Sequence, residues 1–270
     1  RFFGGNAARR AVLRPPGNGT GEPMPTYVVT GGCGFIGSHL VEALRCDGHT
    51  VRVLDDLSTG HRHNLPTDVT LLVGDIRDRD AVVSVLEGAD GCFHLAAIAS
   101  VERGVRDWPG THTVNLSGTI TILDVIRARP APIPLVYASS AAVYGDCPAL
   151  PLAETSPPTP LSAYGADKLG CEQHARVGHA VFGIPSVGLR FFNVYGPRQD
   201  PRSPYSGVIS IFCDRLLRGA PATIYGDGQQ TRDFIAVADV IAALLAAMTH
   251  AERAGGASVF NVCTGVAVSV

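Results

Sequence analysis

The segment Thr30–Gly37, which carries glycines at 31, 34 and 37, constrains the fold of this chain more than any other stretch. An apolar run at 27–29 precedes it, and apolar residues at helical spacing follow it as far as Leu44. A strand, a tight turn and a helix in this order bring bare backbone N–H groups to a helix N-terminus, where the helix dipole favours a pyrophosphate. Glycine is needed because the turn is tight and both ligand and helix come close to the backbone. We therefore predict a dinucleotide site that includes Gly31, Gly34, Phe35, Ile36 and Gly37.

An acidic pair, Asp55-Asp56, ends the next strand-like run at 50–54. Asp55 lies 18 residues after Gly37, close to the spacing of about 20 at which a carboxylate binds the adenosine ribose hydroxyls. A carboxylate in that place would also repel a 2′-phosphate, so the sequence favours NAD over NADP as the cofactor. Asp56 is the alternative ribose ligand.

Strand-like and helix-like segments continue to alternate after this point. The predicted strands end near Asp55, Asp75, Ala96 and Ser140, with helices at 81–86 and 111–129 between them. This alternation predicts an α/β fold with a doubly wound parallel Rossmann sheet, which binds ligands beyond the carboxyl ends of its strands. The four residues just named are therefore expected to gather at one edge of the sheet.

The alternation weakens after residue 192, which predicts a division into two domains. We assign 24–192, together with a returning segment at 234–250, to the NAD-binding Rossmann domain. A smaller, interleaved α/β substrate lobe is expected from 193–233 and 251–270, with a helix at 208–218 and a short strand at 222–225. The sequence stops at Val270, where a further helix would begin, so we expect this lobe to be C-terminally incomplete.

Composition narrows the class of partner. The formal net charge is −2, which argues against nucleic acid or an anionic membrane surface as the main partner. No run of about 18 apolar residues is present, so no membrane span is expected. The seven cysteines are scattered and include no C-x-x-C pair, which suits a reducing cytoplasm and argues against a bound metal.

Residues 1–23 differ from the rest of the chain. They contain four arginines, a single acid at Glu22, and clustered glycine and proline without periodicity. We predict an unstructured extension, either a vector remnant or upstream sequence. An Arg-rich, acid-poor targeting peptide is the alternative.

A tyrosine and a lysine four positions apart, Tyr164 and Lys168, form the second chemical signal. On a helix these positions share a face, so the phenol and the ammonium group can point into one site. A nearby cation favours the phenolate form of a tyrosine, which can then act as a base. A hydroxyl group is available at the predicted sheet edge from Ser140, which follows the strand-like run at 135–138.

With these motifs the chain resembles the extended short-chain dehydrogenase/reductases, and within them the NAD-dependent nucleotide-sugar epimerases and dehydratases. The resemblance runs from Met24 to Val270. It rests on the glycine turn, Asp55, Gly74-Asp75-Ile76, His94-Leu95-Ala96-Ala97, Ser139-Ser140, Tyr164 with Lys168, Phe191-Phe192-Asn193 and Arg232-Asp233-Phe234.

The resemblance implies a role for each matching residue. Asp55 would hold the ribose hydroxyls, Asp75 and Ile76 would flank the adenine, and Ala96 would border the cofactor. Asn115 would support the cofactor site from the helix that follows the fourth strand.

The resemblance also implies the catalytic and substrate groups. Ser140 would hydrogen-bond the reacting hydroxyl of the sugar. Tyr164 would be the base and would contact both the substrate and the cofactor. Lys168 would assist Tyr164 and bind the nicotinamide ribose. Asn193 and Arg232 would contact the diphosphate of a UDP-sugar. A homodimer formed through paired helices is also implied.

Subfamily signals favour a 4-epimerase. Dehydratases and decarboxylases of the family carry an acid just after the active-site hydroxyl, whereas Ser140 is followed by Ala141 and Ala142. Ala99 stands where bacterial UDP-galactose 4-epimerases usually have lysine, so the sugar, UDP-glucose and UDP-galactose or their N-acetyl forms, stays open. The alternatives are a dehydratase, decarboxylase or reductase of the same family, and a non-catalytic NAD-binding sensor or scaffold. The last is disfavoured because Tyr164 and Lys168 are both present.

Overall fold

The computed structural model describes residues 24–269 except 149, 202–206 and 225. Its centre is a seven-stranded sheet in the order β10-β6-β5-β4-β1-β2-β3, in which every pairing is parallel. The strands are β1 (Thr26–Thr30), β2 (Thr50–Asp55), β3 (Thr70–Val73), β4 (Gly91–His94), β5 (Leu135–Ser140), β6 (Ser186–Phe191) and β10 (Ala257–Val262). The order from β3 to β6 is that of a doubly wound dinucleotide-binding sheet, which confirms the predicted fold class.

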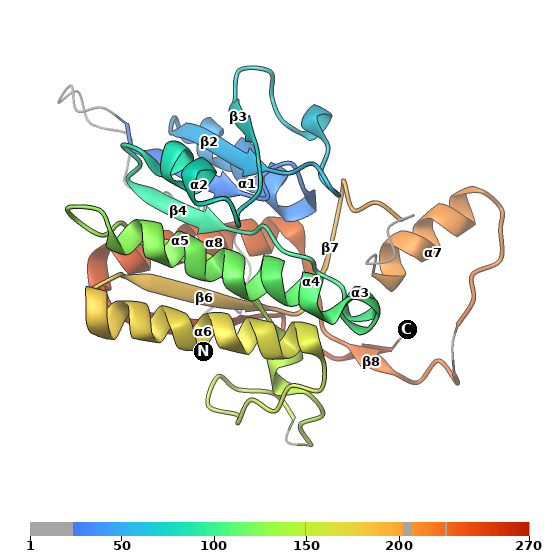
Figure 1. The fold of residues 1–270 in the computed structure, drawn as a ribbon. Coiled ribbons are helices and arrows are strands. Elements are labelled where there is room, and N and C mark those ends of the chain that lie inside the picture. Colours follow the sequence, from blue (N-terminus) through green and yellow to red (C-terminus); the bar gives the residue numbers. More distant parts are fainter. Residues whose placement is uncertain (1–23, 149, 202–206, 225, 270) are drawn as a thin grey trace.

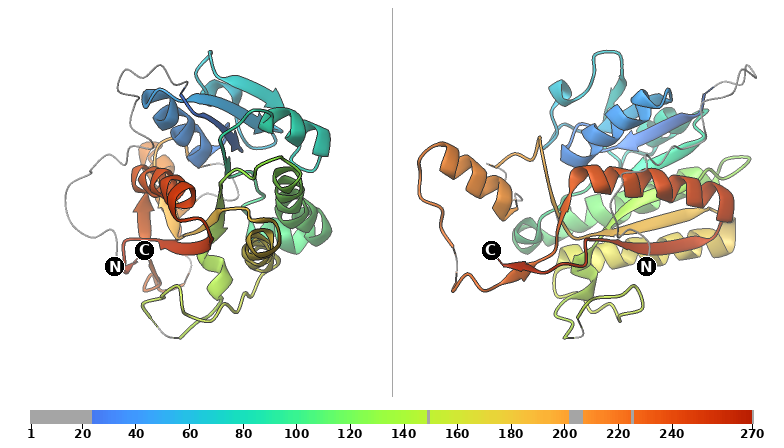
Figure 2. Two further views of the ribbon diagram at one scale, coloured as in Figure 1. Left: turned by 90° about the vertical axis from the view of Figure 1, so that its left-hand side faces the viewer. Right: turned by 180° about the vertical axis from the view of Figure 1, so that it is seen from behind.

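Helices cover both faces of this sheet (Figures 1 and 2). The helices are α1 (Phe35–Cys46), α2 (Arg79–Leu86), α3 (Val101–Arg106), α4 (Trp108–His112), α5 (Gly118–Arg127), α6 (Ala163–Phe182), α7 (Val208–Leu217) and α8 (Val237–Ala254). One apolar core lies between the sheet and the α1–α8 pair, and the other lies between the sheet and α2, α5 and α6. Since both faces of the central strands are buried, these strands are apolar almost throughout.

Short irregular helical segments join several of these elements. They are the 3₁₀ segments η1 (Arg62–Asn64) and η3 (Ala141–Tyr144) and the π-helical segment η2 (Thr113–Ser117). Because η2 connects α4 directly to α5, the helix predicted at 111–129 begins earlier, at Trp108, and contains a π-helical turn.

A smaller group of elements lies outside the main sheet. The strands β7 (Asn193–Tyr195) and β9 (Phe234–Ala236) pair in parallel, and β8 (Thr231–Arg232) pairs antiparallel with β11 (Val268–Ser269). In Figure 1 and in the right-hand view of Figure 2, the helix α7 stands apart from the sheet, next to the long loop that leads to β8. The chain leaves the main sheet after β6 and returns to it through α8, which packs on α1, β5 and β6.

Two sequence predictions differ from this architecture. The sequence places segment 251–270 in the substrate lobe, but its strand β10 pairs with β6 along six residues and forms the edge of the main sheet. The open edge of β6 offers a full set of backbone partners, whereas the small lobe offers only two-residue or three-residue strands. The strand expected at 222–225 is absent at 222–224, where the exposed chain has no neighbouring strand with which to pair. Residue 225 and the predicted extension 1–23 lie outside the described residues.

Candidate active site

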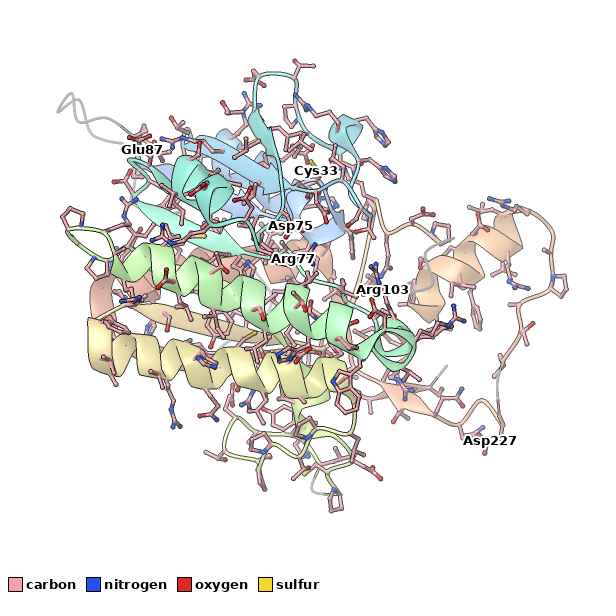
Figure 3. All side chains as sticks on the ribbon, viewed as in Figure 1. Cys33, Asp75, Arg77, Glu87, Arg103 and Asp227 are labelled. Atoms are coloured by element: carbon pink, nitrogen blue, oxygen red, sulfur yellow. The ribbon has the colours of Figure 1, made fainter. Side chains whose placement is uncertain are left out.

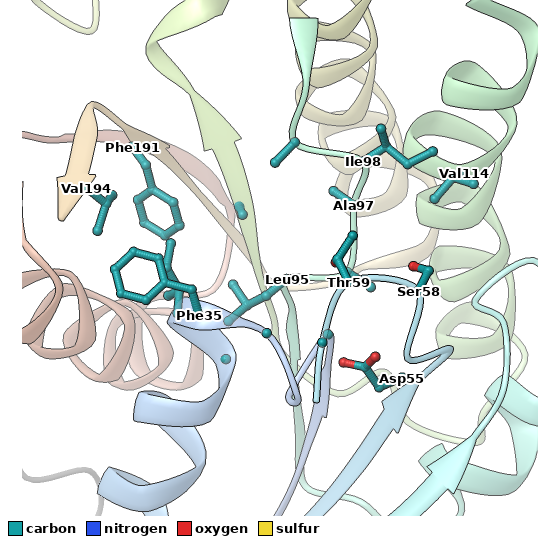
Figure 4. Close-up of a pocket in the computed structure, with 18 of the residues that line it drawn as sticks. Phe35, Asp55, Ser58, Thr59, Leu95, Ala97, Ile98, Val114, Phe191 and Val194 are labelled. Carbon is teal, nitrogen blue, oxygen red and sulfur yellow. The ribbon is translucent and has the colours of Figure 1, made fainter. Parts of the chain in front are cut away.

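A cavity of about 610 Å³ opens at the carboxyl ends of the parallel strands. Its walls come from the glycine turn, the ends of β2, β4, β5 and β6, the start of α6, and residues within 192–200 and 207–209. Of the residues proposed from sequence, those that line it are Gly31, Gly34, Phe35, Ile36, Gly37, Asp55, Asp75, Ile76, Ala96, Ser140, Tyr164, Lys168 and Asn193. The predicted convergence of strand ends therefore occurs around a single cavity, part of which is seen in Figure 4.

The glycine turn is shaped by backbone contacts that leave no room for side chains. Gly31 has a φ of +71°, and a Cβ atom there would lie 2.6 Å from the backbone nitrogen of Ala96. A Cβ atom on Gly37 would overlap the carbonyl oxygen of Gly31. The N-cap of α1, Gly34, has no side chain to bond the first N–H groups of the helix. These N–H groups face the cavity uncapped, which fits the pyrophosphate of a dinucleotide.

Asp55 lies at the other side of this turn, with its side chain almost wholly buried (6% exposed). One carboxylate oxygen accepts from the N–H of Cys33 and the other from the N–H of Leu57, each at 2.9 Å. Burial raises the pKa of Asp55, although the two N–H donors act in the opposite direction. Its carboxylate borders the cavity beside Ser58 and Thr59 (Figure 4), in a place that fits ribose hydroxyl donors.

The end of β3 supplies the next part of the wall. Asp75 forms a bidentate ion pair with Arg77, whose Nε lies 3.0 and 2.9 Å from the two carboxylate oxygens. The hydrogen bonds from Arg77 hold the pKa of Asp75 below its usual value. Ile76 is buried against Gly118 of α5. An apolar side chain next to a fixed ion pair makes a flat wall suited to an adenine ring. Figure 3 shows Cys33, Asp75, Arg77 and Arg103 toward one end of the sheet, away from Glu87.

Asn115 does not line the cavity but contacts the loop that forms part of its wall. It is buried in η2, where it donates to the carbonyl oxygen of Ile98 and accepts from the N–H of Ile98 at 3.1 and 2.8 Å. This pair of bonds fixes the loop that carries Ala96. A π-helical turn at this position agrees with the tendency of such turns to occur at functional sites.

The three candidate catalytic residues meet at the end of β5. Lys168 is buried, and its Nζ donates to the carbonyl oxygen of Ala138 at 2.8 Å. The same Nζ lies 5.8 Å from the centre of the Tyr164 ring. The hydroxyl of Ser140 accepts from the N–H of Ala142 at 3.2 Å and caps η3. A phenol, an ammonium group and a hydroxyl thus share one wall of the cavity, as their sequence positions predicted.

A buried histidine lies near the lysine. His94 is bonded through Nδ1 to Thr30 at 2.7 Å and through Nε2 to Thr119 at 3.0 Å. Burial, reinforced by the charge of Lys168, lowers the pKa of His94 to about 3. The imidazole is therefore neutral at physiological pH, which leaves the ammonium group of Lys168 as the nearby cation.

The two residues proposed to bind a nucleotide diphosphate are placed differently. Asn193 lines the cavity, and its side-chain amide donates to the carbonyl oxygen of Asp233 at 3.1 Å. Arg232 is exposed on β8 and does not line the cavity; its Nη1 donates to the carbonyl oxygen of Thr231. Sequence reasoning did not identify Arg103 and Arg198, two of the arginines that line the cavity. Both sit in segments without a motif, so only the fold could bring them to the cavity.

Membrane spans and metal clusters are both missing from the residues that the structure describes. Among them no helix is long and apolar enough to cross a membrane. No group of three or more His, Cys, Asp or Glu side chains in the same part of the chain could hold a metal ion.

Comparison with known proteins agrees with this geometry. The model of the NAD dependent epimerase/dehydratase family matches residues 27–263. The UDP-glucose 4-epimerase of Mycolicibacterium smegmatis is 40% identical over 248 residues, which cover 90% of this chain and 78% of that protein. The UDP-N-acetylglucosamine 4-epimerase from Methanobrevibacter ruminantium M1, solved with UDP-N-acetylmuramic acid, superposes with a TM-score of 0.86 at 37% identity, covering 92% of this chain and 79% of that one. The UDP-glucose 4-epimerase of Thermus thermophilus, solved with NAD, gives a TM-score of 0.83 at 39% identity, with 90% and 79% covered. The chain therefore belongs to the NAD-dependent epimerase/dehydratase family.

Proposed function

We propose that this protein is a UDP-sugar 4-epimerase that interconverts UDP-glucose and UDP-galactose, or their N-acetyl forms, through a 4-keto intermediate. The observation that carries the proposal is the meeting of Ser140, Tyr164 and Lys168 in a cavity that also contains an uncapped glycine turn and the Asp55 carboxylate. Relatives that are 37–40% identical and are described as UDP-sugar 4-epimerases support it.

The side chains at the end of β5 divide the work of the reaction. Tyr164 takes the proton from the C4 hydroxyl of the sugar, while Ser140 hydrogen-bonds the same oxygen. Lys168 supplies a fixed positive charge beside the phenol, because its own Nζ is held by the carbonyl oxygen of Ala138. NAD, when bound, supplies the reversible oxidation at C4. The planar C4 that results can be reduced from either face if the sugar turns while its nucleotide stays bound.

The segment after Ser140 favours epimerisation over elimination or decarboxylation. Ala141 and Ala142 begin η3 and carry no acid that could donate a proton to a leaving group. The 4-keto sugar therefore meets no obvious acid of the kind that dehydratases and decarboxylases place here, and reduction at C4 is the remaining outcome.

The nucleotide diphosphate would be held by two side chains from β7 and β8. We assign it to Asn193, which already lines the cavity, and to Arg232, whose exposed guanidinium donates to the carbonyl oxygen of Thr231 and keeps further N–H donors. Guanidinium groups suit phosphate because they offer several N–H donors in one plane. Holding the diphosphate rather than the sugar would permit the rotation that inversion requires.

The assembly we propose is a homodimer that works in the cytoplasm. Apolar side chains are exposed on α5 and α6, which lie side by side (Figure 1), and their exposed members are Ile120, Val177, Val181 and Phe182. Such a stripe fits a symmetric contact between two copies. The cysteines of the described residues are free, which suits a reducing compartment. Light scattering on the purified protein tests the assembly, and a monomer at micromolar concentration would contradict it.

Incubation with UDP-glucose deuterated at C4 tests the reaction. We expect UDP-galactose that keeps the deuterium, little solvent hydrogen in the ring and no accumulation of free NADH, all followed by NMR and absorbance. A deoxy-ketosugar product would identify a dehydratase instead. Running UDP-N-acetylglucosamine in parallel decides between the plain and the N-acetylated sugars.

A further inference from the structure

A buried network of charged and polar groups lies next to the catalytic wall, which is the part of the cavity formed by Ser140, Tyr164 and Lys168. The network takes no part in the chemistry described above. Glu172 on α6 and Arg190 on β6 are each 5% exposed and form an ion pair, with Nε and Nη2 of the arginine 2.9 and 2.7 Å from the two carboxylate oxygens. The hydroxyl of Ser139 donates to the same carboxylate at 2.5 Å. Nη1 of Arg190 donates to the hydroxyl of Tyr144 at 2.7 Å. The Tyr144 hydroxyl in turn donates to Asn261 at 2.7 Å.

The register of the sheet explains why these groups meet. Arg190 on β6 lies opposite Ser139 on β5 and opposite Asn261 on β10, so the three residues form one row across three strands. Cross-strand neighbours in a parallel sheet share a face. Glu172 reaches this row from α6, which packs on β5, β6 and β10. The network therefore joins one helix and three strands at a single level.

That level is the one at which the catalytic residues are held. Glu172 lies four residues after Lys168, one helical turn further along α6. Lys168 contacts the backbone of Ala138, and Glu172 contacts the side chain of Ser139. Two successive turns of α6 are thus attached to two successive residues of β5, and the next residue of that strand is Ser140.

A stabilising role alone explains this arrangement poorly. Taking two charges out of water is expensive, and a buried ion pair is often no more stabilising than apolar side chains of similar volume. What such a pair does supply is a fixed geometry, because a planar guanidinium that binds both oxygens of a carboxylate admits little lateral movement.

We propose that Glu172 and Arg190 are positioning residues, which fix the end of β5 against α6 and so set the place of Ser140 relative to Tyr164 and Lys168. This inference rests on the proposed function for its kinetic consequences, but the local rigidity that it requires does not depend on turnover. Displacement of a reacting group by about 1 Å can lower a rate by about 100-fold.

The test replaces both charges together, so that neither is left buried without a partner. The variant Glu172→Leu with Arg190→Met is compared with Arg45→Met with Asp68→Leu, which removes an ion pair at the surface of α1, away from the cavity. Each holoenzyme is examined for its unfolding midpoint, kcat and KM with UDP-glucose, NAD affinity, and hydrogen–deuterium exchange of the segment 139–145 by mass spectrometry.

We expect the buried double variant to unfold near the wild-type midpoint, to keep its KM and NAD affinity, and to lose about 10- to 100-fold in kcat. Its exchange in 139–145 should rise, whereas the control should change none of these quantities. Unchanged kcat and unchanged exchange in a folded double variant would overturn the proposal. Uniformly faster exchange over the whole chain would also overturn it, since it would show a structural role only.

A milder variant covers the case in which the double variant does not fold. Ser139→Ala removes only the hydroxyl that joins β5 to Glu172, and it should lower kcat several-fold with faster exchange in 139–145, while Ser139→Thr should restore both. Ser139→Ala with wild-type kcat and exchange would refute the positioning role. Failure of the wild type to interconvert UDP-sugars would refute the proposed function instead, and the exchange measurements would still decide the role of the network.

Discussion

The two ends of the cavity are built in different ways. At the cofactor end, Gly31 and Gly37 are fixed by backbone contacts, and Asp55 is buried with both of its oxygens bonded to backbone N–H groups. At the proposed substrate end, Asn193 is exposed, and so is Arg232, which lies on β8 outside the lining of the cavity. The neighbouring helix α7 has no buried residue, and its last side chain, Leu217, is 88% exposed.

This difference teaches how each end can recognise its ligand. The cofactor end is shaped before any ligand binds, because main-chain packing leaves its turn no freedom. The proposed substrate end relies on exposed side chains that lose rotamer freedom when they bind, so each contact there has a smaller net value. Substitutions should therefore have large effects near the glycine turn and the catalytic wall, and small effects near β8.

Removal of the phenol that lies between the two ends should have the largest effect. Tyr164→Phe is expected to lower kcat by about 10²–10⁴-fold, the usual contribution of a positioned general base. NAD affinity should stay within about twofold of the wild type, because the phenol is not part of the glycine turn or the ribose site. Steady-state kinetics and cofactor titration measure both, and near-normal turnover would show that another group is the base.

A methyl group in the glycine turn should damage cofactor binding next most strongly. In Gly37→Ala the new Cβ would overlap the backbone of Gly31 and Gly32, neither of which can move aside as a flexible side chain could. We expect a loss of about 10- to 100-fold in NAD affinity, from overpacking worth about 1–3 kcal/mol. Gly178→Ala is the matched control, since Gly178 is also helical and its Cβ would meet only side chains at 3.4 Å or more. Equal NAD affinity in both variants would mean that the turn is not preorganised.

These two ends also differ in how well the sequence predicts them. The glycine turn, Asp55, and the pair Tyr164 and Lys168 depend on local spacing within a strand, turn or helix, so their places in the fold could be derived from sequence. The parallel sheet followed from the alternation of strands and helices.

What could not be derived depends on pairing between distant segments. Residues 257–262 form a strand in either location, and only the free edge of β6 decides that they join the main sheet. Arg103 and Arg198 reach the cavity from segments without periodicity. Glu172 and Arg190 are 18 positions apart in the chain, on α6 and β6. Neither residue carries a local signal of its partner, because the contact depends on how the helix packs on the sheet.

The buried carboxylate at the cofactor end gives a pH dependence. Burial raises the pKa of Asp55, so as the pH falls this group takes up a proton earlier than an exposed aspartate would. A protonated carboxyl is a poorer acceptor for ribose hydroxyls, so NAD affinity should fall on acidification, beginning above the usual range for aspartate.

The same site offers a matched pair of variants. Asp55→Asn should lower NAD affinity about tenfold, because the new NH₂ group would face a backbone N–H and leave it without an acceptor. The variant should also show a flatter dependence of NAD affinity on pH. Asp56→Asn is the control, because Asp56 is exposed and its carboxylate accepts hydrogen bonds from Ser58 of the same loop. Isothermal titration of each variant with NAD at several pH values measures these affinities. A larger loss of NAD affinity in Asp56→Asn than in Asp55→Asn would make Asp56 the ribose ligand.

The smallest effect is expected at the exposed arginine of the substrate end. Arg232→Ala should raise the KM for UDP-glucose about threefold and leave kcat unchanged, because a contact to the diphosphate is made equally in the ground state and the transition state. A charged hydrogen bond in a desolvated site would be worth more than this, but the guanidinium of Arg232 is solvated before binding and must be ordered to reach the ligand. Arg218→Ala is the control, since Arg218 is also exposed but pairs with Asp214 on α7. A KM that rises with increasing salt in the wild type and not in Arg232→Ala would place the charge of this arginine on the substrate. A fall in kcat in Arg232→Ala would show instead that the two ends of the cavity are coupled. The two ends would then differ in exposure but not in function.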